Sequence, residues 1–490
     1  MKKIYYLFFF LMILSSCEDY LDVEPTDRVS GSSVIKSLGD LEYALNGAYS
    51  ILNDNEYYQG NYTFTGDLMA EDFYSDENGG GKLEDIYSYR RSTSTLEAEL
   101  FQTVYLGINH INSSLEKGAK LSLTEDEKDK YEALVAEFKC LRALMHFDIS
   151  KMYGPIYSTL GHGDIHDDAK SIYILEKTIE DPQNVNYRST TKEVYNFVVS
   201  ELSVNAPLLS KEKRNGYLNY WGAKSLLARV YLYMAEYQNA YNIAKEIIQD
   251  SDYELIDMDD YVVSWTKDFT DESIFELSVL PNNPGSINSI GYLCLSDGIM
   301  GYRSIVASNH FLDLRDEHSA DVRFELLQKG FDNEGDFDGW YPMGKYPGRA
   351  GDVFLNNPKL VRLSEIYLIA AETALYVDPS NSGYYLTEIR KRRTNVDSEK
   401  YLTSCSLDDV LFERRLELFC EGHRVFDMRR NFKTIVRYED DIDELGDSPD
   451  DENTGGEIDF DWYKNIYPLT DREIEFLPFV DRLNEQNPGY

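Results

Sequence analysis

The sequence predicts a mostly α-helical fold in which a helical repeat frame carries an irregular, loop-rich lobe. Two observations support this prediction. Apolar residues recur every three or four positions through much of residues 38–250 and again from residue 359 onwards, which is the spacing of amphipathic helices. Residues 251–358 interrupt the pattern, because they are rich in Gly, Asn, Pro and Asp and contain only short apolar runs.

The N-terminus combines a short basic segment, an apolar run and a cysteine. Lys2 and Lys3 precede the run Ile4 to Leu14, which is shorter than the roughly 20 residues needed to span a bilayer. Leu-Ser-Ser then places small residues directly before Cys17. We therefore predict that residues 1–16 are a bacterial signal peptide and that Cys17 is lipidated, which gives a lipid anchor. The alternative is an ordinary signal peptide with an incidental cysteine.

The charge balance excludes one class of partner. The 490 residues carry a formal net charge of -39, so the surface repels DNA, RNA and anionic lipid, and we expect no nucleic-acid binding. Tyrosine is abundant, with 39 Tyr against 4 Trp. These rings either pack in the interior or form flat stacking surfaces for a ligand, and composition alone does not separate the two.

The first third of the chain alternates between helical and irregular stretches. Leu38 to Leu52 is predicted to be a helix, with Leu41, Leu45, Ala48 and Leu52 on one face. Between Gln59 and Thr95 the helical period fails, and three consecutive glycines lie within this stretch, so we expect a long irregular loop of the kind that is more often functional than accidental. Leu134 to Met152 is again helical and is ended by Gly154-Pro155.

Three loops contain side chains that can bind metals. The segment GHGDIHDD from Gly161 to Asp168 brings two histidines and three aspartates together, while residues 331–339 and 438–463 are acidic. None of them has the helical His spacing of a zinc site or the closing Glu of a calcium loop. We therefore favour solvated loops over metal sites, and we expect neither a metal nor a cofactor.

The four remaining cysteines, Cys140, Cys294, Cys405 and Cys420, form no CxxC unit, which argues against a zinc site. Their disulfide status stays open, with a Cys405–Cys420 bridge as one option.

Two helix pairs predict a repeat architecture. Thr191 to Leu209 forms one helix, and Tyr220 to Ile248 then holds two helices in which Ala228 and Ala240 have the spacing of the small residues of a tetratricopeptide repeat. Small side chains are needed there because paired helices approach closely. A second, weaker unit covers Lys359 to Leu375 and Tyr384 to Arg393. The frame therefore includes residues 191–250 and 359–393.

The segment DVLFERRLELFCEGHRVFDMRR, from Asp409 to Arg430, organises the C-terminal part. Its apolar residues have helical spacing up to Gly422, and Glu413, Glu417 and Glu421 form an acidic row along the other face. One interpretation is catalysis, because Arg, Glu and His crowd together. The simpler interpretation is an Arg/Glu network that fixes a helix against the core, and we favour it because no nucleophile or metal set accompanies the segment.

An ordered series of segments follows the lipidation signal and spans nearly the whole chain: CEDYLDVEP, LFQTVYLGINHIN, AEFKCLRALMHFDISKMYG, LLARVYLYMAEYQNAYNIAKEII, RLSEIYLIAAETAL, FERRLELFCEGHRVFDMRR and IYPLTDREIEFLP. This series closely resembles the SusD/RagB family, the nutrient-binding outer-membrane lipoproteins of Bacteroidetes. The resemblance implies one SusD-like domain over residues 17–490, with a tetratricopeptide-like frame and a ligand-binding lobe at about 251–358. Glu18 and Asp19 resemble the acidic signal that sends such lipoproteins to the cell surface.

The resemblance also implies a function without catalysis. Members of this family cover a SusC-like TonB-dependent transporter in the outer membrane and pass it glycans, or peptides in the RagB branch. Glycan-binding members use a platform of aromatic rings flanked by polar groups. The corresponding positions here are Asp72, Phe73, Tyr74, Asn78, Tyr87 and Tyr89 in the early loop, and Tyr292, Tyr302, Arg303, Trp340 and Tyr341 in the lobe. The early loop departs from the family pattern because it lacks Trp.

Three classes of function are compatible with the sequence. The leading hypothesis is a lipid-anchored, surface-exposed protein that binds a glycan and delivers it to a SusC-like transporter, with a peptide ligand of the RagB type as the alternative. The second class is a glycoside hydrolase, but no pair of carboxylates has a recognisable context. The third is a tetratricopeptide scaffold that binds only proteins. The sequence does not identify the ligand.

Overall fold

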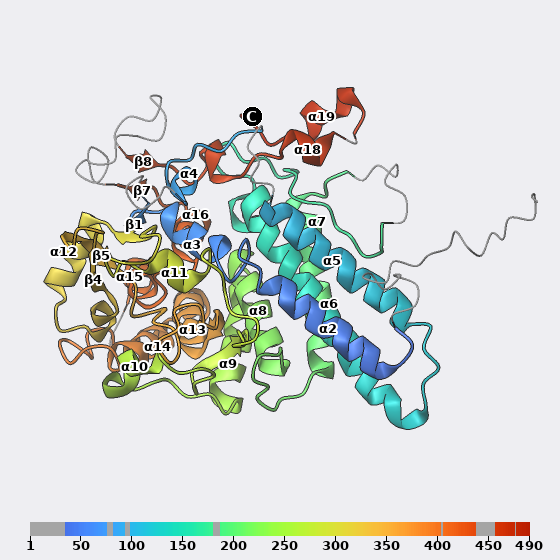
Figure 1. Ribbon diagram of the computed structural model, residues 1–490, viewed down its shortest axis with the longest axis horizontal. Helices are drawn as coiled ribbons and strands as arrows, with labels where there is room; N and C mark the ends of the chain where they lie inside the picture. The colour runs from blue at the N-terminus through green and yellow to red at the C-terminus, as the bar shows by residue number, and fades with distance from the viewer. Residues whose placement is uncertain are drawn as a thin grey trace, which may run out of the picture.

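The computed structural model describes residues 35–75, 82–93, 99–179, 187–402, 405–437, 456–475 and 477–490. Long helices lie side by side on one side of the molecule, and a lobe of short helices and strands forms the other side (Figure 1). The long helices are α2 (Leu38–Leu52), α5 (Glu99–Gly118), α6 (Lys128–Tyr153), α7 (Thr191–Asn205), α8 (Tyr220–Tyr233) and α9 (Tyr237–Asp250). Within the described residues, no helix has both the length and the apolarity that a membrane crossing requires.

Helix α2 forms where the sequence predicts it. Ser37 caps its first turn: the Asp40 N–H donates to the Ser37 hydroxyl at 3.2 Å, and the Ser37 N–H donates to the Asp40 carboxylate at 2.9 Å. The predicted apolar face is buried, at Leu41, Leu45, Ala48 and Leu52. The cap fixes where the helix starts, and the buried face fixes it against α5 and α6.

Helix α6 ends before Gly154 as predicted, and it buries a histidine in its middle. The Leu175 N–H donates to His146 Nε2 at 3.2 Å, so Nδ1 carries the proton and donates to the Arg142 carbonyl at 2.8 Å. Burial lowers the pKa of His146 to about 4. The ring is therefore held in its neutral form, since a second proton would break the bond from Leu175.

The repeat prediction is confirmed by burial. Ala228 on α8 and Ala240 and Ala244 on α9 are all fully buried, where the paired helices pack. The second pair is α13 (Leu363–Val377) with α14 (Pro379–Arg390), and α13 packs against both α14 and α9. These two helix pairs form the continuous frame that the small residues indicate.

In the second repeat unit, the first helix starts later than the sequence predicts and the second helix starts earlier. Residues 359–362 are not helical but form strand β6 (Lys359–Arg362), which pairs antiparallel with β2 (Ser273–Glu276). Helix α14 starts at Pro379 rather than at Tyr384, because a proline is well tolerated in the first turn, where its missing N–H has no helical partner.

The early loop contains a helix that the sequence pattern does not reveal. Residues Gln59 to Thr95, predicted to be irregular, include α3 (Asn61–Leu68), β1 (Phe73–Tyr74) and α4 (Glu84–Tyr87). Residues 62–68 of α3 are all buried. A helix that is buried on every side has no polar face, so it has no amphipathic period to detect.

The lobe is built from short elements around the edge of the helical frame (Figure 1). Its helices are α10 (Met258–Ser264), α11 (Ile290–Cys294) and α12 (Asn309–Glu317), and its strands are β3 (Val306–Ala307), β4 (Gln328–Phe331) and β5 (Phe337–Tyr341). The acidic segment 331–339 is the turn region of the β4–β5 hairpin, where the Asp332 carboxylate accepts the N–H groups of Glu334 and Asp336. Asp332 therefore shapes this turn.

The segment from Asp409 to Arg430, called the signature segment below, bends earlier than predicted. Helix α15 (Leu407–Glu417) ends five residues before Gly422, and α16 (Arg424–Arg430) follows. The turn between them has positive φ at Cys420 (55°) and Gly422 (79°), and the buried Asp67 carboxylate accepts the N–H groups of both residues, at 2.9 and 2.7 Å. Burial raises the pKa of Asp67 to about 8. A distant carboxylate thus stabilises the turn, which the local sequence does not indicate.

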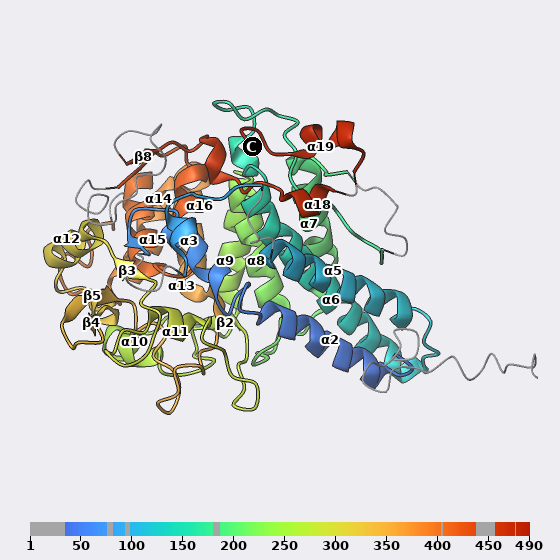
Figure 2. The same cartoon turned by 45° about the horizontal axis from the view of Figure 1, so that its top comes forward.

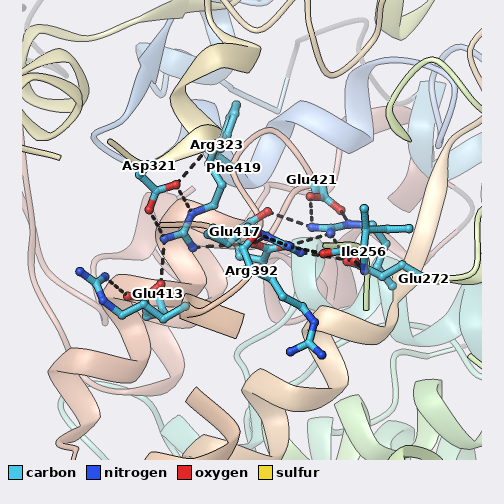
Figure 3. A network of polar contacts seen from close by, with 12 residues as sticks. Ile256, Glu272, Asp321, Arg323, Arg392, Glu413, Glu417, Phe419 and Glu421 are labelled. Atoms are coloured by element: carbon cyan, nitrogen blue, oxygen red, sulfur yellow. Dashed lines mark hydrogen bonds and ion pairs between the residues drawn. The ribbon is translucent and has the colours of Figure 1, made fainter. Parts of the chain in front are cut away.

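The acidic row Glu413, Glu417 and Glu421, which begins on α15 and ends in the turn after it, is the centre of a buried charge network (Figure 3). Glu417 accepts hydrogen bonds from Arg393 at 2.8 Å and from Arg362 at 2.8 Å, and Arg362 also reaches Glu421 at 2.7 Å. Burial alone would raise the pKa of Glu417, but the arginines outweigh it and hold the pKa well below its ordinary range. In the described part of the chain the network joins five carboxylates to five cations: Glu272, Asp321, Glu413, Glu417 and Glu421 with Arg323, Lys345, Arg362, Arg390 and Arg393.

This network supports the structural interpretation of the signature segment. Every carboxylate of the acidic row is engaged by at least two cationic side chains, and Glu413, Glu417 and their partner Arg323 have no exposed surface. His423, next to the network, has its pKa lowered to about 4 by burial. Arg414, on α15, donates to the Asp427 carboxylate at 2.8 Å.

The end of the chain returns to the helical frame. After β7 (Ile435–Val436) and β8 (Glu457–Ile458), helices α18 (Asp471–Ile474) and α19 (Phe479–Glu485) lie near α5 and α7 (Figure 2). The buried Glu485 pairs with Lys170 and accepts the Arg188 N–H at 2.9 Å. The Arg188 guanidinium also donates to Asn487 at 2.7 Å. These contacts fasten the C-terminus to the loop between α6 and α7.

Candidate ligand-binding site

The early loop and the lobe meet through a short sheet. Strand β1 pairs antiparallel with β3, which sets Phe73 opposite Ala307 and Tyr74 opposite Val306. Next to this pairing, the Ser308 N–H donates to the Asp72 carbonyl at 2.9 Å. The two regions that carry the predicted site residues are therefore brought together by backbone hydrogen bonds.

Three aromatic rings form a partly exposed cluster in the lobe. Tyr292, on α11, stacks on Phe354 with ring centroids 5.3 Å apart and planes 12° apart. Tyr302 meets Tyr292 edge-on, with centroids 5.4 Å apart. The ammonium group of the exposed Lys82, from the early loop, lies 5.6 Å above the Tyr302 ring. We call Tyr292, Tyr302 and Phe354 the ring cluster.

Polar groups flank the ring cluster. Arg303 has a positive φ of 54°, an uncommon conformation for a side chain of this size, and its guanidinium donates to the Asp338 carboxylate at 3.1 Å. The Tyr341 hydroxyl donates to the same carboxylate at 2.8 Å. The cluster is thus linked to the β4–β5 hairpin, and the Arg303–Asp338 pair supplies both donors and acceptors beside it.

One buried guanidinium contacts the early loop on both sides of β1. Arg437 donates to the carbonyls of Leu68, Ala70 and Tyr87 at 2.9, 3.0 and 2.8 Å. Its guanidinium also lies 4.0 Å from the centroid of the Tyr87 ring. One side chain therefore connects backbone before β1 with backbone after it.

Comparisons with known proteins identify the fold. Residues 19–232 match the family model described as "Starch-binding associating with outer membrane", and residues 333–490 match the model of the SusD family. The structure is similar to a SusD superfamily protein from Bacteroides thetaiotaomicron, with a TM-score of 0.81, 29% identity and coverage of 92% of this chain and 100% of that one. Taken together, these matches show that this chain is a SusD-like protein.

Other relatives agree with this assignment. The chain is 23% identical to SusD-like protein P25 of Formosa agariphila over an alignment of 501 positions, which covers 86% of this chain and 88% of the relative. Its fold also matches surface glycan-binding protein A of Bacteroides uniformis, with a TM-score of 0.71, 17% identity and coverage of 92% and 99%. The mostly helical, tetratricopeptide-like fold is therefore SusD-like.

Two of the predicted SusD-like platform residues belong to the core instead. Phe73 has no exposed surface and packs against Phe419 and Phe311, with centroids 5.8 and 5.1 Å away. Asp72 is also buried, and Arg415 Nε lies 2.8 and 2.9 Å from its two oxygens. Neither side chain faces the surface. The β1–β3 pairing turns Phe73 inward, and the Arg415 guanidinium binds the Asp72 carboxylate.

The remaining predicted positions divide into buried and partly exposed residues. Tyr87, Tyr89 and Tyr341 are buried, and Trp340 is partly covered by the Arg315 guanidinium, 4.2 Å from the ring centroid. Tyr74 is partly exposed, and its ring is tilted against Tyr87 at 6.3 Å. Asn78 and Cys17 lie outside the described residues. Of the predicted set, Tyr74, Tyr292, Tyr302 and Arg303 therefore stay candidates for ligand contact, and Phe354 joins them.

A group of potential metal ligands lies near β1 but is occupied by arginines. Glu71, Asp72 and His310 bring one ligand atom each within 4.8 Å of one another. Arg424 Nε donates to Glu71 at 3.0 Å and Arg415 binds Asp72, so both carboxylates already face cations. We interpret the group as a buried ion-pair cluster that attaches α15 and α16 to the early loop.

Proposed function

We propose that this protein is a lipid-anchored lipoprotein of the cell surface that binds a glycan and delivers it to a SusC-like TonB-dependent transporter. The SusD-like character of the chain supports the proposal, as does the description of the matching N-terminal model as starch-binding and associated with the outer membrane. The apolar run and LSSC motif before Cys17 support the anchor.

The observation that carries the proposal is the ring cluster. The C–H faces of sugars stack on aromatic rings, and sugar hydroxyl groups need donors and acceptors in fixed positions. Tyr292 and Tyr302 supply partly exposed rings, and Lys82 and the Arg303–Asp338 pair supply polar groups next to them. Such a surface binds an oligosaccharide or polysaccharide without covalent chemistry.

The test compares variants of the ring cluster on polysaccharides. Tyr292→Ala combined with Tyr302→Ala should weaken glycan binding at least about tenfold, since each lost stacking contact contributes roughly 1 kcal/mol. Tyr43→Ala is the matched control, because Tyr43 lies on α2 and is 77% exposed. Affinity electrophoresis in gels that contain soluble starch, laminarin, xylan or mannan measures the effect. Unchanged retardation of the double variant would contradict the ring cluster as the site.

The same panel separates the competing functions. We propose binding without catalysis, so no reducing sugar should be released from any polysaccharide during prolonged incubation. Retention of peptides and of no glycan would favour a RagB-type ligand. A chain that binds neither, but that co-purifies with other proteins, would favour a scaffold.

The anchor and the transporter partner are tested together. Cys17→Ala should abolish incorporation of a lipid label and release the protein from the outer-membrane fraction. The wild-type chain should co-purify with a TonB-dependent barrel after mild detergent extraction. Normal membrane retention of the unlabelled variant would refute the anchor, and purification free of any barrel would refute the partner.

A further inference from the structure

A second surface, distinct from the ring cluster, is concave and is lined in part by the loop 278–286. It is a groove of about 680 Å³ between the C-terminal half of α2, the turn before α8 and the loop after β2. Figure 2 shows the C-terminal end of α2 reaching toward β2 in the middle of the molecule. The groove is lined by side-chain amides from all three segments: Asn46, Asn53, Asn55, Gln59, Asn215 and Asn283.

Three of these amides contain buried polar atoms that have no partner in the protein. Gln59 is only 2% exposed, yet neither its Nε2 nor its Oε1 has a hydrogen-bond partner in the protein. The same holds for the Oδ1 atoms of Asn53 and Asn55. An unpartnered buried amide is costly, so four such atoms along one groove are unusual for a purely structural surface.

The backbone of Gln59 is fixed by a hydrogen bond, and a glycine lies next to its side chain. The Gln59 carbonyl accepts the Ile290 N–H at 2.7 Å. Gly285 faces the amide, and a Cβ at that position would lie only 2.8 Å from Gln59 Nε2. The glycine therefore leaves the room that the amide group occupies.

The character of the groove indicates a neutral ligand. Asp54 is the only charged side chain among its described lining residues, although the whole chain carries a formal net charge of -39. Tyr217 contributes a ring that is 36% exposed, and its hydroxyl donates to Asn46 Oδ1 at 2.9 Å. A ring beside planar amides matches a molecule with apolar C–H faces and many hydroxyl groups.

We propose that this groove is a second carbohydrate-binding site, which takes a neutral sugar and uses the Gln59 amide as both donor and acceptor. The ligand class rests on the proposed function. The groove and the ring cluster share a boundary, because the Phe354 carbonyl accepts the Gly285 N–H at 3.0 Å. A polysaccharide chain can therefore engage both sites of one molecule, which raises the avidity of binding.

The test uses Gln59→Leu, which replaces the unpartnered amide with an apolar side chain of similar size. The substitution removes no hydrogen bond within the protein, so the melting temperature should be unchanged or higher. Binding to the polysaccharide that retards the wild type most, among soluble starch, laminarin, xylan and mannan, should fall about tenfold, because two hydrogen bonds to the ligand are lost. Asn283→Asp, which adds a charge at the exposed rim, should also weaken binding without affecting the fold.

The outcomes separate this inference from the proposed function. Weaker binding by Gln59→Leu in a stable protein, additive with the loss in the Tyr292→Ala/Tyr302→Ala variant, supports two sites. If the ring-cluster variant loses binding while Gln59→Leu and Asn283→Asp bind as the wild type does, the groove holds water only and the inference is wrong. If Gln59→Leu proves unstable, Asn283→Asp decides alone. If the wild type binds no glycan at all, the proposed function fails and the groove proposal fails with it.

Discussion

In the helical frame, α8 and α9 approach each other through small apolar residues, Ala228, Ala240 and Ala244. Around α15, by contrast, buried elements meet through carboxylates and guanidinium groups (Figure 3). Both regions are equally inaccessible to water, but their stability depends on different physics. The frame depends on the volume of its side chains, whereas the network depends on the presence of every charge.

This difference teaches which changes each region tolerates. Apolar packing accepts substitutions that keep volume, at a cost of less than about 1.5 kcal/mol. A balanced network of buried charges does not accept the loss of one member, because the partner is left charged and without solvent. The following predictions test this contrast, from the largest expected effect to the smallest.

Glu417→Leu should have the largest effect. It leaves Arg393 and Arg362 without their central carboxylate in a fully buried site, which costs about 3–5 kcal/mol or more. Glu388→Leu is the control, because Glu388 pairs with the partly exposed Lys391 and Arg392 and should cost at most about 1 kcal/mol. Chemical denaturation measures both variants. Equal losses of stability would show that the network is no more critical than a surface pair.

Ala228→Glu should destabilise the frame by several kcal/mol, because a longer charged side chain has no room at a fully buried helix contact. Ala119→Glu introduces the same side chain at an exposed position after α5 and should have little effect. Thermal unfolding followed by circular dichroism separates the two. An unchanged melting temperature for Ala228→Glu would mean that the repeat packing differs from that described.

Phe73→Ala and Tyr74→Ala should differ although the residues are neighbours. Phe73 is fully buried between Phe311 and Phe419, so its loss should cost about 3–5 kcal/mol. Tyr74 is partly exposed, and its loss should cost clearly less. Urea denaturation compares the two variants, and a reversed order would mean that the two side chains of β1 face the other way.

Acid should destabilise the protein in two separate pH ranges. The pKa of His146 falls from 6.5 to about 4 on folding, so its contribution is complete above pH 6.5 and is lost as the pH falls toward 4, by up to roughly 3 kcal/mol. The pKa of His423 is also lowered to about 4, so its contribution to stability is lost over the same pH range. Glu365, whose pKa is lowered to about 2 because Arg229 outweighs burial, loses its contribution only between pH 4.5 and 2. Urea unfolding of the wild type and His146→Gln between pH 7.5 and 4.5 should give a shallower pH dependence for the variant, and identical slopes would show that His146 is not held neutral.

The sequence predicts the frame well because its signals are local. The apolar period of α2 and α6 and the small residues at Ala228 and Ala240 are visible within a few turns of chain. Helix α3 escapes detection because it is buried on every side, and the end of α15 escapes because it depends on Asp67, which is more than 350 residues away. The local sequence pattern reveals neither the burial of α3 nor the contact with Asp67.

The candidate site was only partly predictable for a similar reason. The early loop and the lobe are correctly expected to meet, but the direction of each ring depends on how β1 pairs with β3. That pairing sends Phe73 inward and leaves Tyr74 partly exposed. The amide groove had no sequence signal at all, since its residues come from three separate segments and share no motif.

The Arg437 side chain has a consequence for the thermodynamics of ligand capture. By binding the carbonyls of Leu68, Ala70 and Tyr87 at once, it fixes the backbone at these three positions when the protein folds. The conformational entropy of these positions is therefore lost on folding, before any ligand arrives. For the glycan ligand that we propose, the ordering cost of association then falls mainly on the ligand.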